Sequence, residues 1–357
     1  MGSKRQQTDP LVKSLRKLSP GTELRSGLDN ILAARTGALI VLGDESVLRL
    51  ADGGFKIDAD FLPTHVYELA KMDGALVLSA DGKKILRANT QLNPDPSIET
   101  IETGTRHRTA ERVAKQTGCL VVSISQRRNV ITVYRGQHKY VFREINVLLN
   151  KANQAIQTLE KYRKAFDAAV SVLTTLEMDD LVTLNDVCVC MQRAEMVLRV
   201  SDEIERYIIE LGVEGRLVSL QLEELSGPVS GELHNIVQDY KKSRDLDGKR
   251  ILEELLDLNS DELLDLSHMV RILGYTSGVD LLDAPVFTKG IRILSKIPRI
   301  PGNVIDNIIT HFTDFQDILG AAEDDLDEVE GVGMVRARNI REGLRRIGER
   351  SMIDANR

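Results

Sequence analysis

Strand-forming residues are confined to the N-terminal part of the chain, and this division constrains the fold more than any other feature. The strongest strand candidates are apolar, β-branched runs at 38–42, 75–78, 119–124 and 130–134. After Asn150 such runs stop, and apolar residues recur at helical spacing, beginning with Ala152, Ile156 and Leu159. The pattern predicts a multidomain α+β protein: a mixed α/β domain followed by helices only.

The length of the chain supports several domains. At 357 residues it is too long for one ordinary core, so we expect two or three. We assign the mixed α/β domain to 1–148, an all-helical spine to 149–285 and a C-terminal module to 286–357. Charged residues of the spine are expected to mark solvated helix faces, so this part is predicted to carry no chemistry of its own.

Composition excludes several classes of protein. A net charge of −7 argues against a surface coated with positive charge for nucleic acid, so any DNA contact must depend on a local basic patch. We expect a cytoplasmic protein with no membrane partner, because no run approaches about eighteen apolar residues and the first seven residues lack the apolar core of a secretion signal. The three cysteines lack Cys-x-x-Cys spacing, which predicts buried thiols rather than disulfides or zinc ligands; they are Cys119, Cys188 and Cys190.

The run at 104–112 is the strongest candidate for a binding site. It places three arginines, a histidine and two threonines at a predicted helix start. Helix N-termini attract anions through unpaired N–H groups, and guanidinium groups match phosphate oxygens in a two-pronged geometry. Positive charges at a helix N-terminus interact unfavourably with the helix dipole, so the presence of three arginines at this end calls for a functional explanation. The run therefore predicts a phosphate site, with a solvated helix face as the alternative; no P-loop motif is present.

Asp73 supplies a candidate carboxylate for the same site. A lone Asp-Gly pair is most often a simple turn. Here, however, Asp73 and Gly74 lie between a predicted short helix at 64–72 and the buried strand at 75–78. Asp73 is therefore expected at a helix-to-strand junction.

The C-terminal module carries a possible DNA-binding motif. Gly331-Val332-Gly333 resembles the hairpin of a helix-hairpin-helix module, in which glycines let the backbone approach a phosphate. Arg336 and Arg338 follow it, and a degenerate copy lies at 301–303. The alternative is an arginine-rich helix that pairs with the acidic residues at 321–330. Contact with phosphates alone would make binding structure-dependent, poorly sequence-specific and sensitive to salt.

Together these motifs resemble the DisA family of DNA-integrity-scanning diadenylate cyclases over essentially the whole chain. The matching stretches are 27–43, 72–75, 104–112 and the terminal hairpin. The resemblance implies condensation of two ATP molecules into cyclic di-AMP with release of two pyrophosphates, assisted by Mg²⁺ or Mn²⁺. It also implies a homo-octamer built from four active pairs. From the two ends of the chain together, we expect branched DNA, which offers several phosphate backbones at once, to inhibit synthesis, and we expect the protein to associate with the nucleoid.

The resemblance further implies residue roles. Asp73 would act on the attacking 3′-hydroxyl as metal ligand or proton acceptor, and the backbone at Gly74 and Leu92 would contact the nucleotide. The triphosphate would be held by one run of five residues, with two weaker candidates beside it: Thr105, Arg106, His107, Arg108 and Thr109, then Ser125 and Arg128.

The chemistry of the product sets the assembly independently of the family. Each chain has one Asp-Gly-Ala and one Arg-His-Arg, whereas cyclic di-AMP contains two equivalent adenylate units, so a two-fold dimer is the smallest catalyst. One alternative is a non-catalytic DNA-binding protein that senses a nucleotide. Another, a repair nucleotidyltransferase, is disfavoured because no Asp-x-Asp accompanies the Arg-His-Arg run.

Overall fold

The computed structural model describes residues 10–275 and 281–355. Contacts within the chain divide it into two units. The first comprises Met1–Gln154 and Glu203–Leu220, and the second Ala155–Asp202 and Gln221–Arg357. The limits of these two units fall inside long helices rather than at their ends. The division therefore does not test the predicted domain boundaries at 148 and 285, which stay a prediction.

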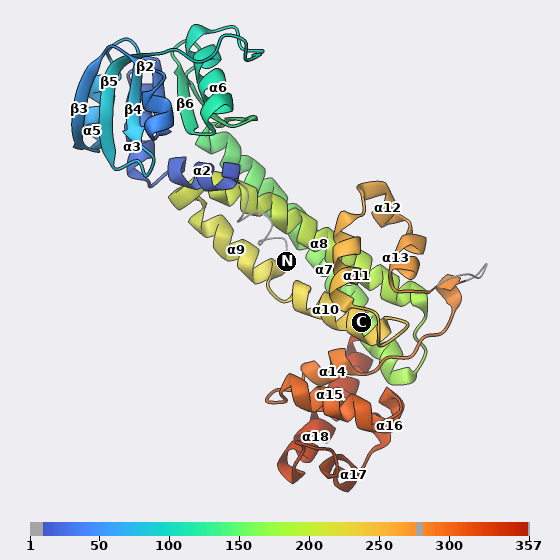
Figure 1. The fold of residues 1–357 in the computed structure, drawn as a ribbon. Coiled ribbons are helices and arrows are strands. Elements are labelled where there is room, and N and C mark those ends of the chain that lie inside the picture. Colours follow the sequence, from blue (N-terminus) through green and yellow to red (C-terminus); the bar gives the residue numbers. More distant parts are fainter. Residues whose placement is uncertain (1–9, 276–280, 356–357) are drawn as a thin grey trace. The chain divides into compact units, whose positions relative to one another are not determined.

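The first unit contains the whole sheet (Figure 1). Its strand order is β2-β5-β4-β1-β6-β7-β8, and β3 also pairs with β5. β1 and β4 are parallel, and the other pairs are antiparallel. The strands are β1 Ala38–Gly43, β2 Ala51–Asp52, β3 Phe55–Asp60, β4 Ala75–Ser79, β5 Lys84–Leu92, β6 Leu120–Ser125, β7 Val130–Arg135 and β8 His138–Val141.

The sheet separates two apolar cores because its central strands are buried on both faces. In β1, Ile40 and Leu42 pack into one core and Leu39 and Val41 into the other. The first core is completed by α2 Pro10–Leu18, α3 Glu23–Ala33 and α5 Pro63–Leu69; the second is completed by α4 Glu45–Leu48 and α6 Thr105–Thr117.

The four predicted strands are confirmed to within one residue at each end, whereas β2, β3 and β8 were missed. The missed strands carry mostly exposed or half-exposed residues, so they lack the apolar runs by which the central strands were recognised.

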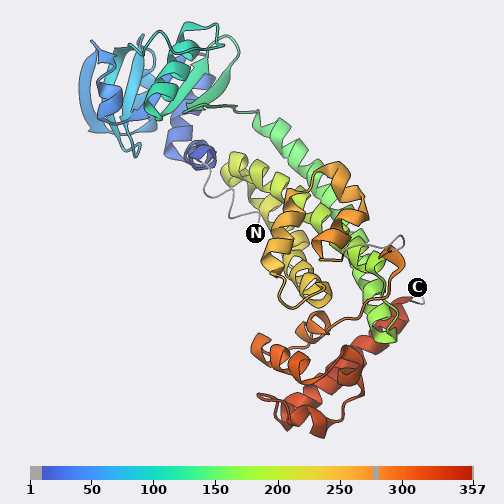
Figure 2. The same cartoon turned by 45° about the vertical axis from the view of Figure 1, so that its right-hand side comes forward.

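The remaining elements are helices, as predicted from the periodicity after Asn150 (Figure 2). Ser226-Gly227-Pro228 interrupts the helical pattern in the sequence, and at this point one helix ends at Ser226 and the next begins at Val229. The elements are α7 Ile145–Asp179, α8 Leu184–Leu211, η1 Gly212–Gly215, α9 Arg216–Ser226, α10 Val229–Tyr240, α11 Gly248–Asp257, α12 Ser260–Leu264, α13 Leu266–Ile272, η2 Leu281–Asp283, α14 Ile291–Ser295, α15 Gly302–His311, α16 Phe315–Gly320, α17 Glu323–Asp327 and α18 Met334–Ala355.

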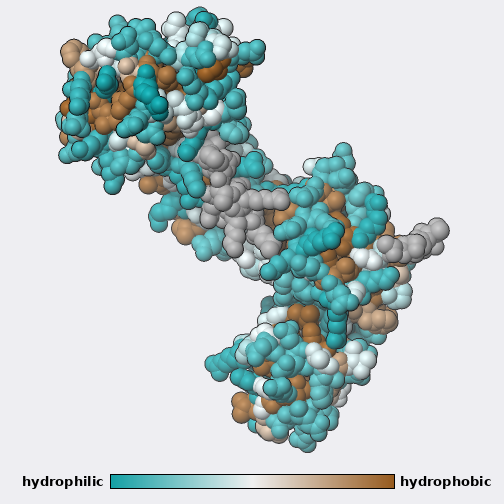
Figure 3. All heavy atoms as spheres, viewed as in Figure 1, coloured by the Kyte–Doolittle hydropathy of each residue, from teal (hydrophilic) through white to brown (hydrophobic). Residues whose placement is uncertain are grey.

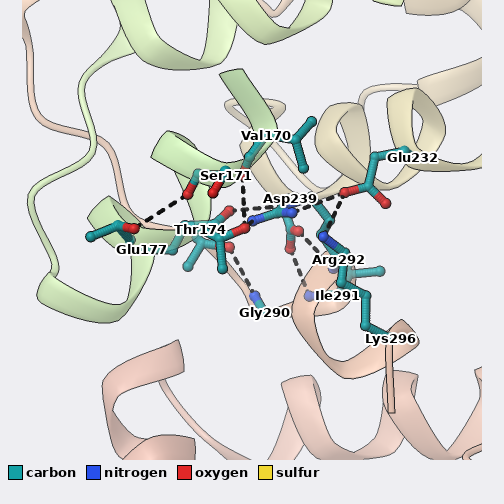
Figure 4. Close-up of polar contacts among 12 residues, drawn as sticks. Val170, Ser171, Thr174, Glu177, Glu232, Asp239, Gly290, Ile291, Arg292 and Lys296 are labelled. Atoms are coloured by element: carbon teal, nitrogen blue, oxygen red, sulfur yellow. Dashed lines mark hydrogen bonds and ion pairs between the residues drawn. The ribbon is translucent and has the colours of Figure 1, made fainter. Parts of the chain in front are cut away.

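A buried ionic network in the second unit joins α14 to α7 and α10 (Figure 4). The side chain of Arg292 is fully buried, and its guanidinium group forms an ion pair with Glu177. It also donates to Glu232 Oε1 at 2.9 Å and to Thr174 Oγ1 at 3.0 Å. Three elements distant in sequence are therefore held by one side chain.

Asp239 of α10 completes this network from the other side. Its two carboxylate oxygens accept the backbone N–H groups of Ile291 and Arg292, each at 2.8 Å. Burial raises the pKa of Asp239 to about 7. The expectation that charged residues of the spine mark solvated faces is thus wrong for Asp239 and Glu177, both of which are buried.

Polar residues cover most of the molecular surface on the face seen in Figure 3. Within the described ranges, no helix is long and apolar enough to span a membrane. Cys188 and Cys190 are buried, as predicted, but Cys119 is only partly buried because it precedes β6 at the edge of the second core.

Candidate functional site

A cavity of about 530 Å³ in the first unit brings together most of the predicted site. Its lining includes six predicted residues: Asp73, Gly74, Leu92, Thr105, Arg106 and Thr109. Sequence reasoning missed the others, which are Leu39, Asp52, Gly53, Gly54, Ala75, Asn89, Thr90 and Gln91. The adjacent glycines 53 and 54, beside an aspartate, were the available signal for this second loop.

Asp73 lies between the end of α5 and the start of β4, at the predicted junction. Its side chain is fully exposed, and its Oδ1 atom lies 3.9 Å from Nη2 of Arg106. A pair this long and this exposed contributes little, so the carboxylate stays available to another group. Gly37 makes room for the guanidinium, because a Cβ atom there would lie 2.5 Å from Arg106 Nη1.

Gly74 allows the Asp73 loop to lie directly on β5. Its φ of +88° is in the left-handed region, and a Cβ atom would lie 2.9 Å from backbone atoms of Asn89 and Thr90. The β4–β5 register is interrupted beside it, between Ala75 and Val77. Glycine is therefore required by both the backbone conformation and the close approach.

The N-terminus of α6 faces the same cavity. The helix begins at Thr105, and its N-cap residue, Gly104, provides no side-chain cap. The first backbone N–H groups therefore lack a capping partner within the residues described, which suits an anion. Thr105 and Thr109 lie one helical turn apart, and both line the cavity.

His107 does not line this cavity, and its ring contacts the interior of the domain instead. Its Nδ1 atom lies 3.0 Å from the hydroxyl oxygen of Tyr134, and that hydroxyl donates to Glu102 Oε1 at 2.9 Å. Lys139 forms an ion pair with the same carboxylate. Burial lowers the pKa of His107, and the nearby charge of Glu102 offsets this only in part.

Arg108 lies beside a second cavity, of about 500 Å³, on another side of α6. Its Nε donates to the carbonyl oxygen of Glu102 at 3.4 Å. Arg112 and Lys115, further along the helix, donate to the carbonyl oxygens of Ile98 and Glu99, each at 2.9 Å. These three cations hold the 98–102 loop against α6, and the role of Arg108 at the triphosphate stays a prediction.

Ser125 and Arg128 lie outside the lining of both cavities. The Ser125 hydroxyl accepts the backbone N–H of Arg128 at 3.2 Å, across the turn between β6 and β7. This bond accounts for a serine at the end of β6 by turn geometry, so a nucleotide role for either residue stays a prediction.

The cavity suits a divalent metal that arrives with a nucleotide. No group of three or more metal-ligating side chains gathers within the described ranges. Asp73 and Asp52 are the carboxylates in the cavity lining. Mg²⁺ is commonly held by one or two carboxylates together with substrate phosphates, so an exposed Asp73 fits such an ion.

The predicted hairpin opens α18 in the C-terminal part. Gly331 has a φ of +84°, and a Cβ atom there would lie 3.3 Å from Val304 of α15. Asn307, also on α15, donates to the carbonyl oxygen of Glu330 at 2.8 Å. The hairpin is thus fixed against α15, the helix that begins within the degenerate copy at 301–303.

The arginines of α18 differ in their partners. Arg345 and Arg346 pair with acids of the same helix one turn away. Arg338 lies 3.5 Å from Glu323 of α17, and Arg336 donates to the carbonyl oxygen of Gly331. The acidic residues at 321–330 therefore neutralise only some of the arginines of α18.

Comparisons with known proteins cover the whole chain. Residues 25–139 match the family model described as "DisA bacterial checkpoint controller nucleotide-binding", and residues 142–282 match "DisA bacterial checkpoint controller linker region". A protein from Acetivibrio thermocellus called "DNA integrity scanning protein DisA" is 55% identical over 357 residues, covering 100% of this chain and 99% of its own. A Clostridium kluyveri protein of the same name is 54% identical, covering 96% of this chain and 97% of its own.

Proposed function

The chain belongs to the DisA family and is a diadenylate cyclase, and from this premise we propose that two copies meet face to face to condense two ATP molecules. Each chain has one Asp73 and one Arg-His-Arg run, whereas the product contains two equivalent adenylate units. A two-fold pair is therefore the smallest catalyst. The observation that carries the proposal is the complete exposure of the Asp73 carboxylate in the lining of the cavity.

In this proposal each nucleotide is both attacker and target. The 3′-oxygen of one ATP forms a bond to the α-phosphorus of the other, the bond from that phosphorus to pyrophosphate breaks, and pyrophosphate leaves with the electron pair. Asp73 acts on the attacking 3′-hydroxyl, which loses its proton to water as the new bond forms, while the triphosphate is held by Arg106, Thr105, Thr109 and the N-terminus of α6. Such in-line transfer depends on placement, and the two chains provide it together.

Enzymes of this family need a divalent metal. We assign Asp73 as its protein ligand, with Mg²⁺ or Mn²⁺ as the ion. Bound there, the ion would neutralise phosphate charge and make the 3′-hydroxyl more acidic. The backbone of Gly74 and Leu92 borders the nucleotide in the same cavity.

The test is synthesis by purified protein supplied with ATP and Mn²⁺ or Mg²⁺. We expect one cyclic di-AMP for every two pyrophosphates, and we expect Asp73→Asn to abolish synthesis while ATP still binds. Asp52→Asn is the matched control, because it removes the other carboxylate of the cavity lining. Equal losses in the two variants would remove the special role of Asp73.

The face-to-face pairing has its own test. Specific activity should fall on dilution into the concentration range in which sedimentation shows single chains, whereas ATP binding per chain should not change. Constant specific activity in that range would contradict the proposal. The same sedimentation experiment tests the octamer built from four active pairs.

We further propose that the C-terminal helices form a helix-hairpin-helix module that binds DNA through phosphates. The relatives' printed name, "DNA integrity scanning protein", favours this assignment, as do the glycine hairpin and the basic start of α18. Backbone groups at Gly331, Val332 and Gly333 would contact a phosphate, with Arg336 and Arg338 beside them. Branched DNA, which presents several backbones at once, is the expected ligand.

The DNA assignment is tested by paired substitutions on α18. Replacing Arg336 and Arg338 by alanine should weaken binding to a Holliday junction. It should also reduce the slope of the logarithm of the binding constant against the logarithm of salt concentration by the equivalent of about two phosphate contacts. Replacing Arg345 and Arg346, which already pair with acids of their own helix, is the control. Equal effects would place the DNA elsewhere.

Regulation follows if DNA alters how the cyclase domains meet. We expect saturating Holliday junctions to inhibit synthesis, so that the amount of cyclic di-AMP reports chromosome integrity. We also expect the protein to associate with the nucleoid, because it binds DNA. Equal rates of synthesis with and without the junction would contradict this coupling.

A further inference from the structure

Within the residues that the structure describes, three helices continue from one unit into the other, and they are α7, α8 and α9. Helix α8 belongs to the second unit up to Asp202 and to the first unit from Glu203 onward. A displacement of the spine that travels along α8 therefore enters the first unit at the last turns of this helix. The contacts made there determine which part of the unit such a displacement reaches.

Glu210 fixes the last turn of α8 to the segment that joins β8 to α7. The side chain is buried, although it is a carboxylate. Its Oε1 atom accepts the backbone N–H of Arg143 at 3.0 Å, and its Oε2 atom accepts the hydroxyl of Tyr140. Burial raises the pKa of Tyr140 well above its ordinary value, so the hydroxyl keeps its proton and remains a donor. Both carboxylate oxygens are thus bound by the same short segment.

The turn that follows α8 packs directly on the turn between α2 and α3. Gly212 has a φ of +54°, and a Cβ atom there would overlap the carbonyl oxygen of Pro20. The same carbonyl oxygen accepts the backbone N–H of Val213 at 3.1 Å. The hydroxyl oxygen of Ser19 lies 2.8 Å from the carbonyl oxygen of Ile209. The end of α8 is therefore fixed on two sides, so close packing transmits a displacement instead of absorbing it.

Strand β8 connects this helix end to the nucleotide site. Tyr140 packs against the first core, whereas the preceding residue, Lys139, forms an ion pair with Glu102 in the loop before α6. Adjacent residues of a strand point to opposite faces, so β8 joins α8 on one face of the sheet to the α6 loop on the other. Glu102 lies two residues before Gly104, the N-cap of α6. A shift of β8 therefore displaces the helix end that is proposed to hold the triphosphate.

We propose that Glu210 is a positioning residue: it transmits a displacement of α8, produced when DNA binds the C-terminal module, through Tyr140 and β8 to the N-terminus of α6. Loss of this contact would separate α8 from β8 while the nucleotide cavity and the C-terminal hairpin keep their residues. In-line transfer between two chains depends on accurate placement of each triphosphate, so a small shift of α6 is enough to slow synthesis. This inference rests on the proposed inhibition of synthesis by DNA.

Hydrogen exchange tests the contact without DNA or nucleotide. In Glu210→Ala the backbone N–H of Arg143 loses its acceptor, so we expect its exchange to become about tenfold faster. Glu203→Ala is the matched control, because Glu203 lies on the same helix but accepts its hydrogen bond from Tyr207, which is also on α8. Equal exchange at Arg143 in the wild type and in Glu210→Ala would overturn the inference.

Synthesis with and without saturating Holliday junctions tests the transmission. We expect Tyr140→Phe to make cyclic di-AMP and to bind the junction within about twofold of the wild type, but to be inhibited about threefold less. Tyr67→Phe is the matched control: Tyr67 also flanks the first core, but its ring contacts Lys71 instead of a carboxylate. A merely structural role of the Tyr140 hydroxyl would lower thermal stability and leave the fold of inhibition unchanged, and that result would overturn the inference.

A second variant tests the path beyond β8. Lys139→Met removes the ion pair with Glu102, so it should also reduce the fold of inhibition. It should leave the exchange of the Arg143 amide unchanged, because that amide is bound by Glu210 and not by Glu102. Full inhibition in Lys139→Met would contradict the path through β8. Failure of the proposed regulation is separate, because junctions would then fail to inhibit even the wild type.

Discussion

Gly74→Ala tests how the loop that carries Asp73 is held. A non-glycine residue at a φ of +88° costs about 1–2 kcal/mol. The new methyl group would also lie 2.9 Å from backbone atoms of Asn89 and Thr90, which belong to a paired strand and cannot rotate away. Overpacking of this kind adds roughly 1–3 kcal/mol. The sum, roughly 2–5 kcal/mol, is relieved most readily if the loop moves away from β5.

Displacement of the loop displaces Asp73. Because a shift of about 1 Å in a reacting group costs on the order of 100-fold in rate, kcat for cyclic di-AMP synthesis should fall about 100-fold in Gly74→Ala. The assay is steady-state synthesis at saturating ATP, together with thermal unfolding to show that the variant is folded. Gly136→Ala is the control, since Gly136 has a φ of +55° but nothing within 4 Å of the added Cβ atom.

The control separates backbone strain from the steric effect. Both variants carry a non-glycine residue in the left-handed region, but only Gly74→Ala forces a methyl group onto β5. If Gly74→Ala retained kcat within twofold of Gly136→Ala, the contact with β5 would not position Asp73, and the reasoning would be refuted.

Three further predictions concern other parts of the molecule. Arg292→Met leaves Glu177 buried without its cation, so we expect a loss of about 3–5 kcal/mol in urea unfolding; a loss below about 1 kcal/mol would contradict this. Folding raises the pKa of Asp239 from 3.8 to about 7, so between these pH values the folded state holds a proton on this group that the unfolded state does not. The contribution of Asp239 to the free energy of unfolding is therefore complete below about pH 4 and is lost as pH rises through 7. Asp239→Asn should remove that component of the pH dependence, and identical urea-derived pH profiles would be inconsistent with it. Arg106→Ala should weaken ATP binding about 10- to 100-fold in calorimetry, and Arg128→Ala, outside both cavities, should weaken it less; the reverse order would disprove the assignment.

The central elements of the site could be predicted from sequence because their signals are local. β1 and β4 are buried on both faces, so they appear as unbroken apolar runs. The start of α6 at Thr105 follows from the residues at that point, and Asp73 lies between two elements that were each recognisable. Close approach of these segments in space then followed from the family resemblance.

The directions of individual side chains could not be predicted. His107 and Arg108 are neighbours in one motif, yet they contact Tyr134 and Glu102, and these partners come from a strand and a loop outside the motif. Arg292 lies in an apolar run that contains no sign of a buried cation. Its partners lie 53 to 118 positions away in sequence, so only the tertiary fold brings them together.

The carboxylate of Asp239 has a consequence for the order in which the C-terminal part becomes structured. Helix α14 is only five residues long, too short to persist alone, and its first two amide protons are bound by a side chain from α10. Opening of α10 would release both protons to solvent at once. Helices α10 and α14 should therefore exchange their amide hydrogens as one cooperative unit, although about fifty positions separate them along the chain.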